Sequence, residues 1–269
     1  MRLFWPVRRP EARLFPLRDE NPTSLTPLIT YLLVGANVAA WILIQGAGIS
    51  EDVLAGAVCA FGAIPAEITG AAEGFRAVEL GPGLPPCMLG GLTNGALFTS
   101  MFMHGSWFHL ISNLWFLWIF GNNIEDSMGH LRFLAFYLVA GVLAALAHVV
   151  ATPASPVPMV GASGAISGVM GAYLLLYPRV RIQTFFFFII FFRVIPIPAW
   201  IVLVWWFVLQ VLSGVSAPVD AAGVAFWAHI GGFLTGVLLV KIFENRQLVA
   251  ARRHHVQLSP FEVPHRGWW

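Results

Sequence analysis

The chain is poor in charged residues. Only 10% of its 269 residues are Asp, Glu, Lys or Arg and 58% are hydrophobic, whereas soluble domains average about 25% charged residues. The net charge of +2 offers no strongly basic surface, so we expect no nucleic-acid partner. Cys59 and Cys87 are too few for a disulfide framework and lack metal-ligand spacing, so no metal is expected. Whether these two cysteines pair stays open on the sequence.

Long apolar blocks make up most of the sequence. Windows of membrane-spanning length cover residues 26–45, 107–121, 131–151, 162–177, 195–212 and 224–242. They predict an all-α polytopic membrane protein, a bundle of six transmembrane helices. The apolar run Phe185–Phe192 is too short to cross alone. We place it along the membrane surface or as the lead-in to the fifth span.

The spans divide the chain into three parts. Residues 1–25 form a basic N-terminal segment, residues 26–243 hold the spans and a long loop at 46–106, and residues 244–269 form a polar tail. Six spans place fourteen of the fifteen Lys and Arg residues in or next to segments on one side of the membrane. Only Arg76 falls on the other side. Positive charge stays on the cytoplasmic side, so both termini are expected there. We expect a multi-pass protein of a plasma (bacterial inner) membrane, with the lipid bilayer as a partner.

Three polar clusters interrupt the apolar blocks. Ser163 opens the fourth span, His229 lies in the sixth, and His104, His109 and Asn113 lead into the second. These three spans run in the same direction, so each cluster falls in the outer half of its span, at a similar depth. Polar groups within a membrane are costly and usually functional. Their agreement in depth therefore predicts one common site.

The residue types in these clusters suit acyl transfer. A serine hydroxyl is a weak nucleophile that a neighbouring histidine activates, and small residues let membrane helices come close enough for this. Four glycines are expected to allow that approach: Gly164 and Gly168 on the fourth span, Gly232 and Gly236 on the sixth. His109 and Asn113 are four residues apart, so both can face a developing oxyanion. No Asp or Glu lies in the outer half of a span, so we expect a Ser-His dyad.

Four motifs, in order along the chain, resemble the rhomboid intramembrane serine proteases. They are HGSWFHLISN, GNNIEDSMG, GASGAISG and AHIGGFLTG. The resemblance runs from about residue 27 to 242 and implies a six-helix rhomboid bundle that uses no cofactor. It implies that Ser163 is the nucleophile and His229 the general base. His109, Asn113 and backbone around Gly161 would then line the oxyanion hole.

The resemblance also implies supporting roles and a class of substrate. Glu125 matches a structural glutamate in the turn between the second and third spans, and we assign His104 a structural role as well. Some family members place a tyrosine four residues after the serine, beside the histidine. Ser167 occupies that position here, so no such ring is expected. Rhomboids cleave other membrane proteins within or near a transmembrane helix, so single-span membrane proteins are the expected substrates.

Two other functions stay open beside the serine endopeptidase. One is a proteolytically inactive rhomboid-like protein that binds membrane clients, although such proteins usually lack the serine or the histidine. The other is a transporter or channel that uses the polar cavity. The sequence has no inverted repeat and no carboxylate well inside a span, which disfavours transport.

Overall fold

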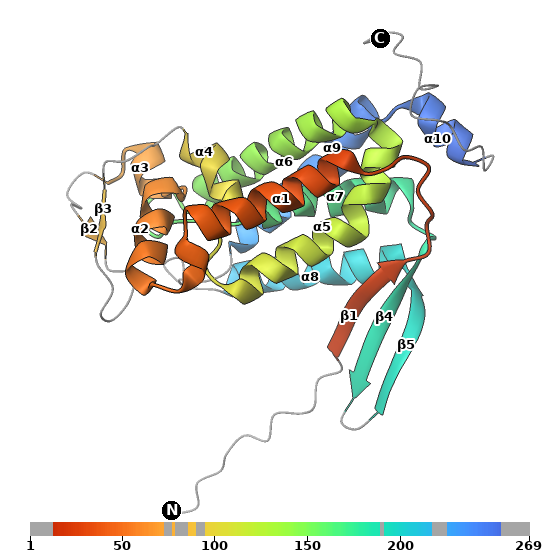
Figure 1. The fold of residues 1–269 in the computed structure, drawn as a ribbon, viewed down its shortest axis with the longest axis horizontal. Coiled ribbons are helices and arrows are strands. Elements are labelled where there is room, and N and C mark those ends of the chain that lie inside the picture. Colours follow the sequence, from red (N-terminus) through yellow and green to blue (C-terminus); the bar gives the residue numbers. More distant parts are fainter. Residues whose placement is uncertain are drawn as a thin grey trace, which may run out of the picture.

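Six long helices lie side by side in one bundle (Figure 1). The computed structural model describes residues 13–72, 77–78, 86–89, 95–188, 191–216 and 225–253. The long helices are α1 (Leu28–Leu43), α5 (Trp107–Met128), α6 (His130–Ala151), α7 (Ser163–Leu176), α8 (Ala199–Ser216) and α9 (Phe226–Phe243). Each of them covers one of the six apolar windows in the sequence.

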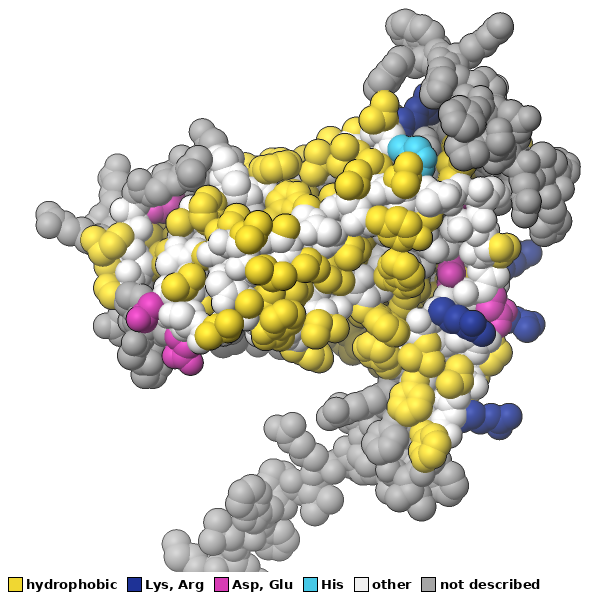
Figure 2. Space-filling model, in the orientation of Figure 1, with side chains coloured by type: hydrophobic (Ala, Val, Ile, Leu, Met, Phe, Trp, Pro, Cys, Tyr) yellow, Lys and Arg dark blue, Asp and Glu magenta, His cyan; other side chains and the backbone are white. Residues whose placement is uncertain are grey.

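The lengths of these helices differ. Within the described residues, α6, α8 and α9 are long and apolar enough to cross a membrane, while α1 and α7 are apolar but shorter. Figure 2 shows hydrophobic side chains over the middle of the bundle, and exposed large residues include Leu43, Phe108 and Leu238. A surface this apolar suits contact with lipid. The protein is a multi-pass membrane protein, and the count of six spans stays a prediction.

α7 lies at the centre of the bundle, in contact with α5, α6 and α9. Every residue from Gly164 to Tyr173 is buried, which suits a helix that is apolar on all sides. A Cβ on Gly232 of α9 would overlap the carbonyl oxygen of Gly164. One turn further along, a Cβ on Gly236 would overlap the carbonyl oxygen of Gly168 in the same way. The backbones of α7 and α9 therefore touch with no side chain between them.

Gly164 and Gly168 of α7 face α6 more closely than α9, whereas Gly171 faces the backbone of α9 at Phe233. A Cβ on Gly164 would lie 2.8 Å from the Cβ of Ala144, and one on Gly168 would lie 2.7 Å from the Cβ of Ala140. The next atom that a Cβ on Gly168 would meet is the carbonyl oxygen of Gly232, at 3.3 Å. Small residues thus pack three helices against one another, with α7 in the middle.

A three-stranded antiparallel sheet projects from one end of the bundle (Figure 1), and it corrects the all-α prediction. Its strands, in the order β1-β4-β5, are β1 (Arg13–Asp19), β4 (Arg181–Phe188) and β5 (Phe191–Pro198). Residues 185–188 and 191–192 of the apolar run therefore lie in paired strands of this sheet, and the second of these strands leads into α8 at Ala199. Phe, Ile and Val favour strands. Pro196 and Pro198 keep a helix from starting before Ala199.

The long loop between α1 and α5 is partly folded and lies at the opposite end of the bundle (Figure 1). It holds η1 (Gly46–Gly48), α2 (Glu51–Phe61), α3 (Pro65–Thr69), β2 (Ala77–Val78), β3 (Cys87–Met88), α4 (Ala96–Thr99) and η2 (Ser100–Phe102). A disulfide joins Cys59 of α2 to Cys87 of β3, with 5.5 Å between their Cα atoms. The pairing that the sequence left open is thus present. The last helix, α10 (Arg246–Arg253), follows α9 at the end that carries the sheet.

The backbone contact between α7 and α9 makes bulk at Gly232 intolerable. We expect Gly232→Leu to lower the melting temperature in detergent by more than about 5 °C, because overpacking costs about 1–3 kcal/mol or more and each kcal/mol is worth about 2–4 °C. Gly35→Leu on α1 is the matched control, since a Cβ there meets nothing within 4 Å. Equal melting temperatures for the two variants would show that α7 and α9 do not touch at Gly232.

Candidate active site

Ser163 is the first residue of α7. Just before it, Gly161 has a φ of 126°, which L side chains rarely adopt, so the chain turns sharply into the helix. The N–H of Gly161 donates to the carbonyl oxygen of Ser100 at 2.8 Å and anchors this turn. The serine hydroxyl consequently lies at the N-terminal end of α7, where the helix dipole is positive.

His229 lies in the first turn of α9. Its Nε2 is 2.7 Å from Ser163 Oγ, although the two residues are 66 positions apart in the sequence. Gly164, which follows Ser163 directly, touches Gly232, which lies about one turn beyond His229, so the side chains of Ser163 and His229 meet next to that contact. The structure brings together the serine and the histidine that the sequence suggested.

His109 lies beside the turn that precedes Ser163. Its Nδ1 accepts the N–H of Gly105 at 3.3 Å, so a neutral ring carries its proton on Nε2. A Cβ built on Gly161 would lie 2.8 Å from this Nε2 and 3.5 Å from Ser163 Oγ. A side chain at position 161 would therefore collide with the His109 ring. Glycine is what lets this ring, with its Nε2 donor, lie against the turn that carries Ser163.

Asn113 and Gly161, the other two residues expected at the oxyanion hole, already have hydrogen-bond partners. Asn113 is 5% exposed, and its Nδ2 donates to the carbonyl oxygen of His109 at 2.8 Å. Part of its donor capacity is therefore used within α5, and one N–H of the amide is left for other partners. The backbone N–H of Gly161 is engaged by Ser100. Gly161 thus contributes conformation and space to the site rather than a free donor.

His104 packs against the ring of His109. It is fully buried, and its ring centroid lies 5.1 Å from that of His109. Gln45 holds its backbone, accepting its N–H at 2.9 Å and donating to its carbonyl oxygen at 2.6 Å. Burial, with a further contribution from nearby His109, lowers the pKa of His104 to about 3, so the ring is neutral. Its ring nitrogens have no hydrogen-bond partner among the described residues, which fits a packing role.

Two side chains of α8 that the sequence analysis did not single out lie against His229. Gln210 places its Oε1 2.8 Å from His229 Nδ1. The ring centroid of Trp206 is 5.8 Å from that of His229, so an aromatic ring lies beside the histidine, although none comes from position 167. It comes from α8, while Ser167 donates its hydroxyl to the carbonyl oxygen of Ser163 at 2.6 Å. The sequence signal was the one amide side chain in an otherwise apolar helix.

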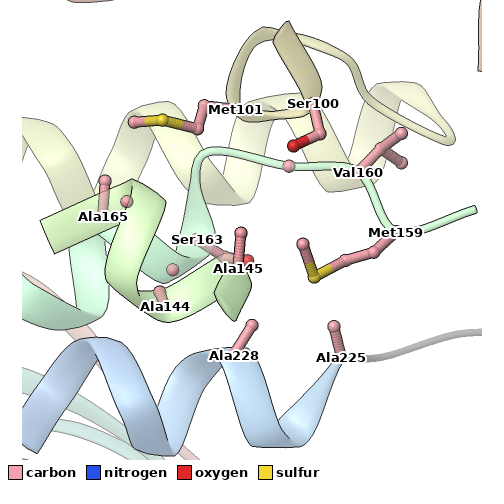
Figure 3. A pocket seen from close by; sticks show the side chains of 13 residues that line it. Ser100, Met101, Ala144, Ala145, Met159, Val160, Ser163, Ala165, Ala225 and Ala228 are labelled. Atoms are coloured by element: carbon pink, nitrogen blue, oxygen red, sulfur yellow. The ribbon is translucent and has the colours of Figure 1, made fainter. Parts of the chain in front are cut away.

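A small apolar pocket adjoins Ser163 (Figure 3). Its volume is about 10 Å³, enough for about one water molecule. Alanines of three helices line it together with Met101, Met159 and Val160: Ala144 and Ala145 of α6, Ala165 of α7 and Ala228 of α9. Such a pocket has room for a small side chain next to Ser163 and none for a large one.

The family follows from a comparison of the sequence with known domains. The Rhomboid domain profile matches residues 94–246, more than half of the chain. The chain belongs to the rhomboid family. The matched residues include Ser163, His229, His109 and Gln210. They leave out α1, which nevertheless packs on α5 within the same bundle.

Curated relatives of this rhomboid come from several eukaryotes. It is 33% identical over 152 residues to "Rhomboid protein 1, mitochondrial" of Saccharomyces cerevisiae, covering 52% of this chain and 39% of the yeast protein. It is 30% identical over 173 residues to the human "Presenilin-associated rhomboid-like protein, mitochondrial", covering 60% of this chain and 42% of that protein. It is 36% identical over 145 residues to "Rhomboid-like protease 5" of Toxoplasma gondii, covering 51% and 15%.

These relatives set limits on what carries over. The chain spans about two fifths of the length of the yeast and human proteins, so their activities and partners do not transfer directly. Two of the names place the relatives in mitochondria. They lend no support to the plasma membrane that we expected from the sequence, and the membrane of this rhomboid stays a prediction.

Glu125 lies at the far end of the bundle from Ser163 and holds the start of α1. Its buried carboxylate accepts the backbone N–H groups of Ile29 and Thr30 at 2.8 Å each and the Thr30 hydroxyl at 2.7 Å. It also lies 2.6 Å from His130 Nδ1. The helix itself starts after Pro27 with no side-chain cap. Glu125 therefore supplies from another helix the negative cap that the N-terminus of α1 needs.

Asp126, next to Glu125, binds the segment before α1 in the same way. Its carboxylate accepts the N–H groups of Ser24 and Leu25 at 3.0 and 2.6 Å. Residues 122–130 were expected to form a turn, but α5 continues to Met128 and ends at Gly129, whose φ is 78°. The expectation of a turn is wrong because buried backbone groups of the N-terminal segment pair with these carboxylates and keep them inside.

We expect Glu125→Ala to destabilise this rhomboid without touching Ser163. The variant leaves buried N–H groups of α1 without an acceptor, and each hydrogen bond to a charged group is worth about 1.5–3 kcal/mol. Thermal unfolding in detergent should show a melting temperature lower by about 5 °C or more. Glu51→Ala, at an exposed position of α2, is the control. If both variants melt with the wild type, Glu125 does not hold α1.

Proposed function

We propose that this rhomboid is an intramembrane serine endopeptidase that cleaves single-span membrane proteins within or near their transmembrane helix. The observation that carries the proposal is the 2.7 Å hydrogen bond between Ser163 Oγ and His229 Nε2. Nucleophile and base at this distance are the signature of an activated hydroxyl. The alternative, an inactive protein that binds membrane clients, gives no reason for that bond.

The proposed reaction needs only groups of this chain, the peptide and water. Ser163 Oγ attacks the scissile carbonyl carbon while its proton passes to His229 Nε2. The tetrahedral intermediate expels the amine, which takes the proton from His229, and an acyl ester stays on Ser163. Water then attacks the ester and gives its proton to His229. The second product leaves as a carboxylic acid, and the serine regains its proton.

The oxyanion has a natural position beside Gly161. His109 Nε2 lies against Gly161, two residues before Ser163, and from there it can donate to the oxygen of the scissile carbonyl. The first N–H groups of a helix lack intrahelical partners, and the positive end of α7 adds to the attraction. We propose that His109 and the N-terminus of α7 hold the developing charge, with Asn113 in a secondary role.

The arrangement of charge supports the proposed orientation and domain limits. Figure 2 shows dark blue Lys and Arg side chains at the end of the molecule that carries the sheet. By the positive-inside rule we place this end, with residues 1–25 and 244–269, on the cytoplasmic side. Residues 26–243 would then form the protease domain, with Ser163 recessed below the opposite face of the membrane.

The pocket supports a choice of substrate. Because it is lined by alanines and is only about 10 Å³ in volume, we propose a small residue such as Ala or Gly next to the cut. The substrate must also leave its helix to reach Ser163, which costs backbone hydrogen bonds in lipid. Residues that weaken a helix near the cut therefore favour cleavage.

The proposed dyad predicts that Ser163→Ala and His229→Ala each abolish cleavage of a single-span substrate in liposomes. The double variant should lose little more than either single one, because the two side chains act as a unit. Cleavage is followed on gels, and the cut site is mapped by mass spectrometry. Ser213→Ala on α8 is the control and should cleave normally.

Two outcomes would contradict this proposal. Near-wild-type turnover in either single variant would remove that residue from the chemistry. Failure of the folded wild-type protein to react with a fluorophosphonate, a serine-directed probe, would favour the client-binding protein instead.

The oxyanion proposal predicts unequal effects for the two donors on α5. His109→Ala should lower kcat by about 100- to 1,000-fold, as removal of one oxyanion donor does in a soluble serine protease. Asn113→Ala should lower kcat less, because its Nδ2 is already bonded to the His109 carbonyl. Steady-state kinetics in detergent measures both, with KM nearly unchanged. The reverse order, or no loss in the double variant, would exclude this oxyanion position.

A further inference from the structure

We propose that Gln210 is a positioning residue for the base, holding His229 in the one tautomer that can take a proton from Ser163. The inference rests on the proposed serine-protease function and extends the dyad by a third, uncharged side chain. Gln210 Oε1 lies 2.8 Å from His229 Nδ1, while Nε2 of the same ring lies 2.7 Å from Ser163 Oγ. The imidazole is thus held at both nitrogens.

The position of Gln210 is set by the face that α8 turns toward α9. Trp206, Gln210 and Gly214 are spaced one turn apart on that helix and so share a face. Trp206 packs on Phe233, with ring centroids 6.1 Å apart. A Cβ on Gly214 would lie 3.2 Å from the Cβ of Phe226. Contacts above and below therefore fix Gln210 against His229.

The amide oxygen decides which nitrogen carries the proton. A neutral imidazole has one N–H donor and one acceptor nitrogen, and a carbonyl oxygen only accepts. While the amide presents Oε1, as it does here, the matching tautomer carries its proton on Nδ1 and directs the lone pair of Nε2 at the Ser163 hydroxyl. The other tautomer would point an N–H at the serine oxygen and leave no base. Gln210 selects the productive form before any substrate arrives.

The surroundings of α8 explain why a glutamine occurs in it. Its buried residues are Ala199, Leu203 and Gly214, and Val208 and Leu209 next to Gln210 are 39% and 40% exposed. An amide in such an apolar helix is costly unless it has a polar partner, and His229 is that partner. A neutral amide orients the ring without placing a second charge in the membrane, where ionised groups cost more still.

Two substitutions at Gln210 separate orientation from packing. Gln210→Met keeps the length of the side chain and removes the amide oxygen. We expect kcat to fall about 10-fold or more, on the scale of losing a partner that orients a functional histidine, with KM within about 2-fold. Gln210→Glu restores an acceptor oxygen and should keep kcat within about 3-fold of the wild type. Leu209→Met, the same new side chain on the neighbouring lipid-facing position, should leave kcat unchanged.

A second readout does not depend on activity. Nitrogen NMR of ¹⁵N-histidine-labelled protein distinguishes protonated from unprotonated ring nitrogens, and the signals of His229 are identified by their loss in His229→Asn. We expect the wild type at neutral pH to show a protonated Nδ1, and Gln210→Met to show a mixture of both tautomers. An unprotonated Nδ1 in the wild type, or wild-type kcat in Gln210→Met, would overturn the proposal. Absence of cleavage by the wild type with Nδ1 protonated would refute the protease and leave the role of Gln210 standing.

Discussion

The backbone contact between α7 and α9 is the constraint on which the site depends. Gly232 and Gly236 face carbonyl oxygens of α7 with no side chain between the helices, and lipid supplies no hydrophobic force to hold helices together, so close packing has to do it. Ser163 and His229 sit at the outer end of this contact, where their side chains meet at 2.7 Å. The glycines therefore determine the distance between the serine and the histidine without contributing a side chain to the site.

Two networks of hydrogen bonds between distant parts of the chain lie at opposite ends of the bundle. At the sheet end, Glu125 and Asp126 accept backbone N–H groups of the segment that leads into α1. At the other end, Ser163, His229 and Gln210 form one chain of hydrogen bonds across three helices. Because an unpaired polar group in lipid is costly, each set ties together elements that are distant in sequence.

The two sets differ in charge, and this difference fits their tasks. The carboxylates of Glu125 and Asp126 bind the N-terminus of α1 and the segment before it, at the end of the bundle that carries the sheet. The serine site uses only neutral side chains, which keeps its polar groups poised inside an apolar bundle without isolated charge. Gly161 adds the remaining feature, because any side chain at this position would collide with the ring of His109.

The sequence alone determined the six apolar helices, the family, and the serine, histidine and glycines that meet, because hydropathy and spacing are local properties of the chain. It did not determine the β1-β4-β5 sheet, since strand pairing joins residues 13–19 to residues 181–198 across most of the chain. Nor did it show that Glu125 and Asp126 are buried, since their partners lie about a hundred residues away. Only the tertiary structure placed Trp206 and Gln210 of α8 against His229, because which face of an apolar helix meets its neighbour depends on packing that hydropathy does not encode.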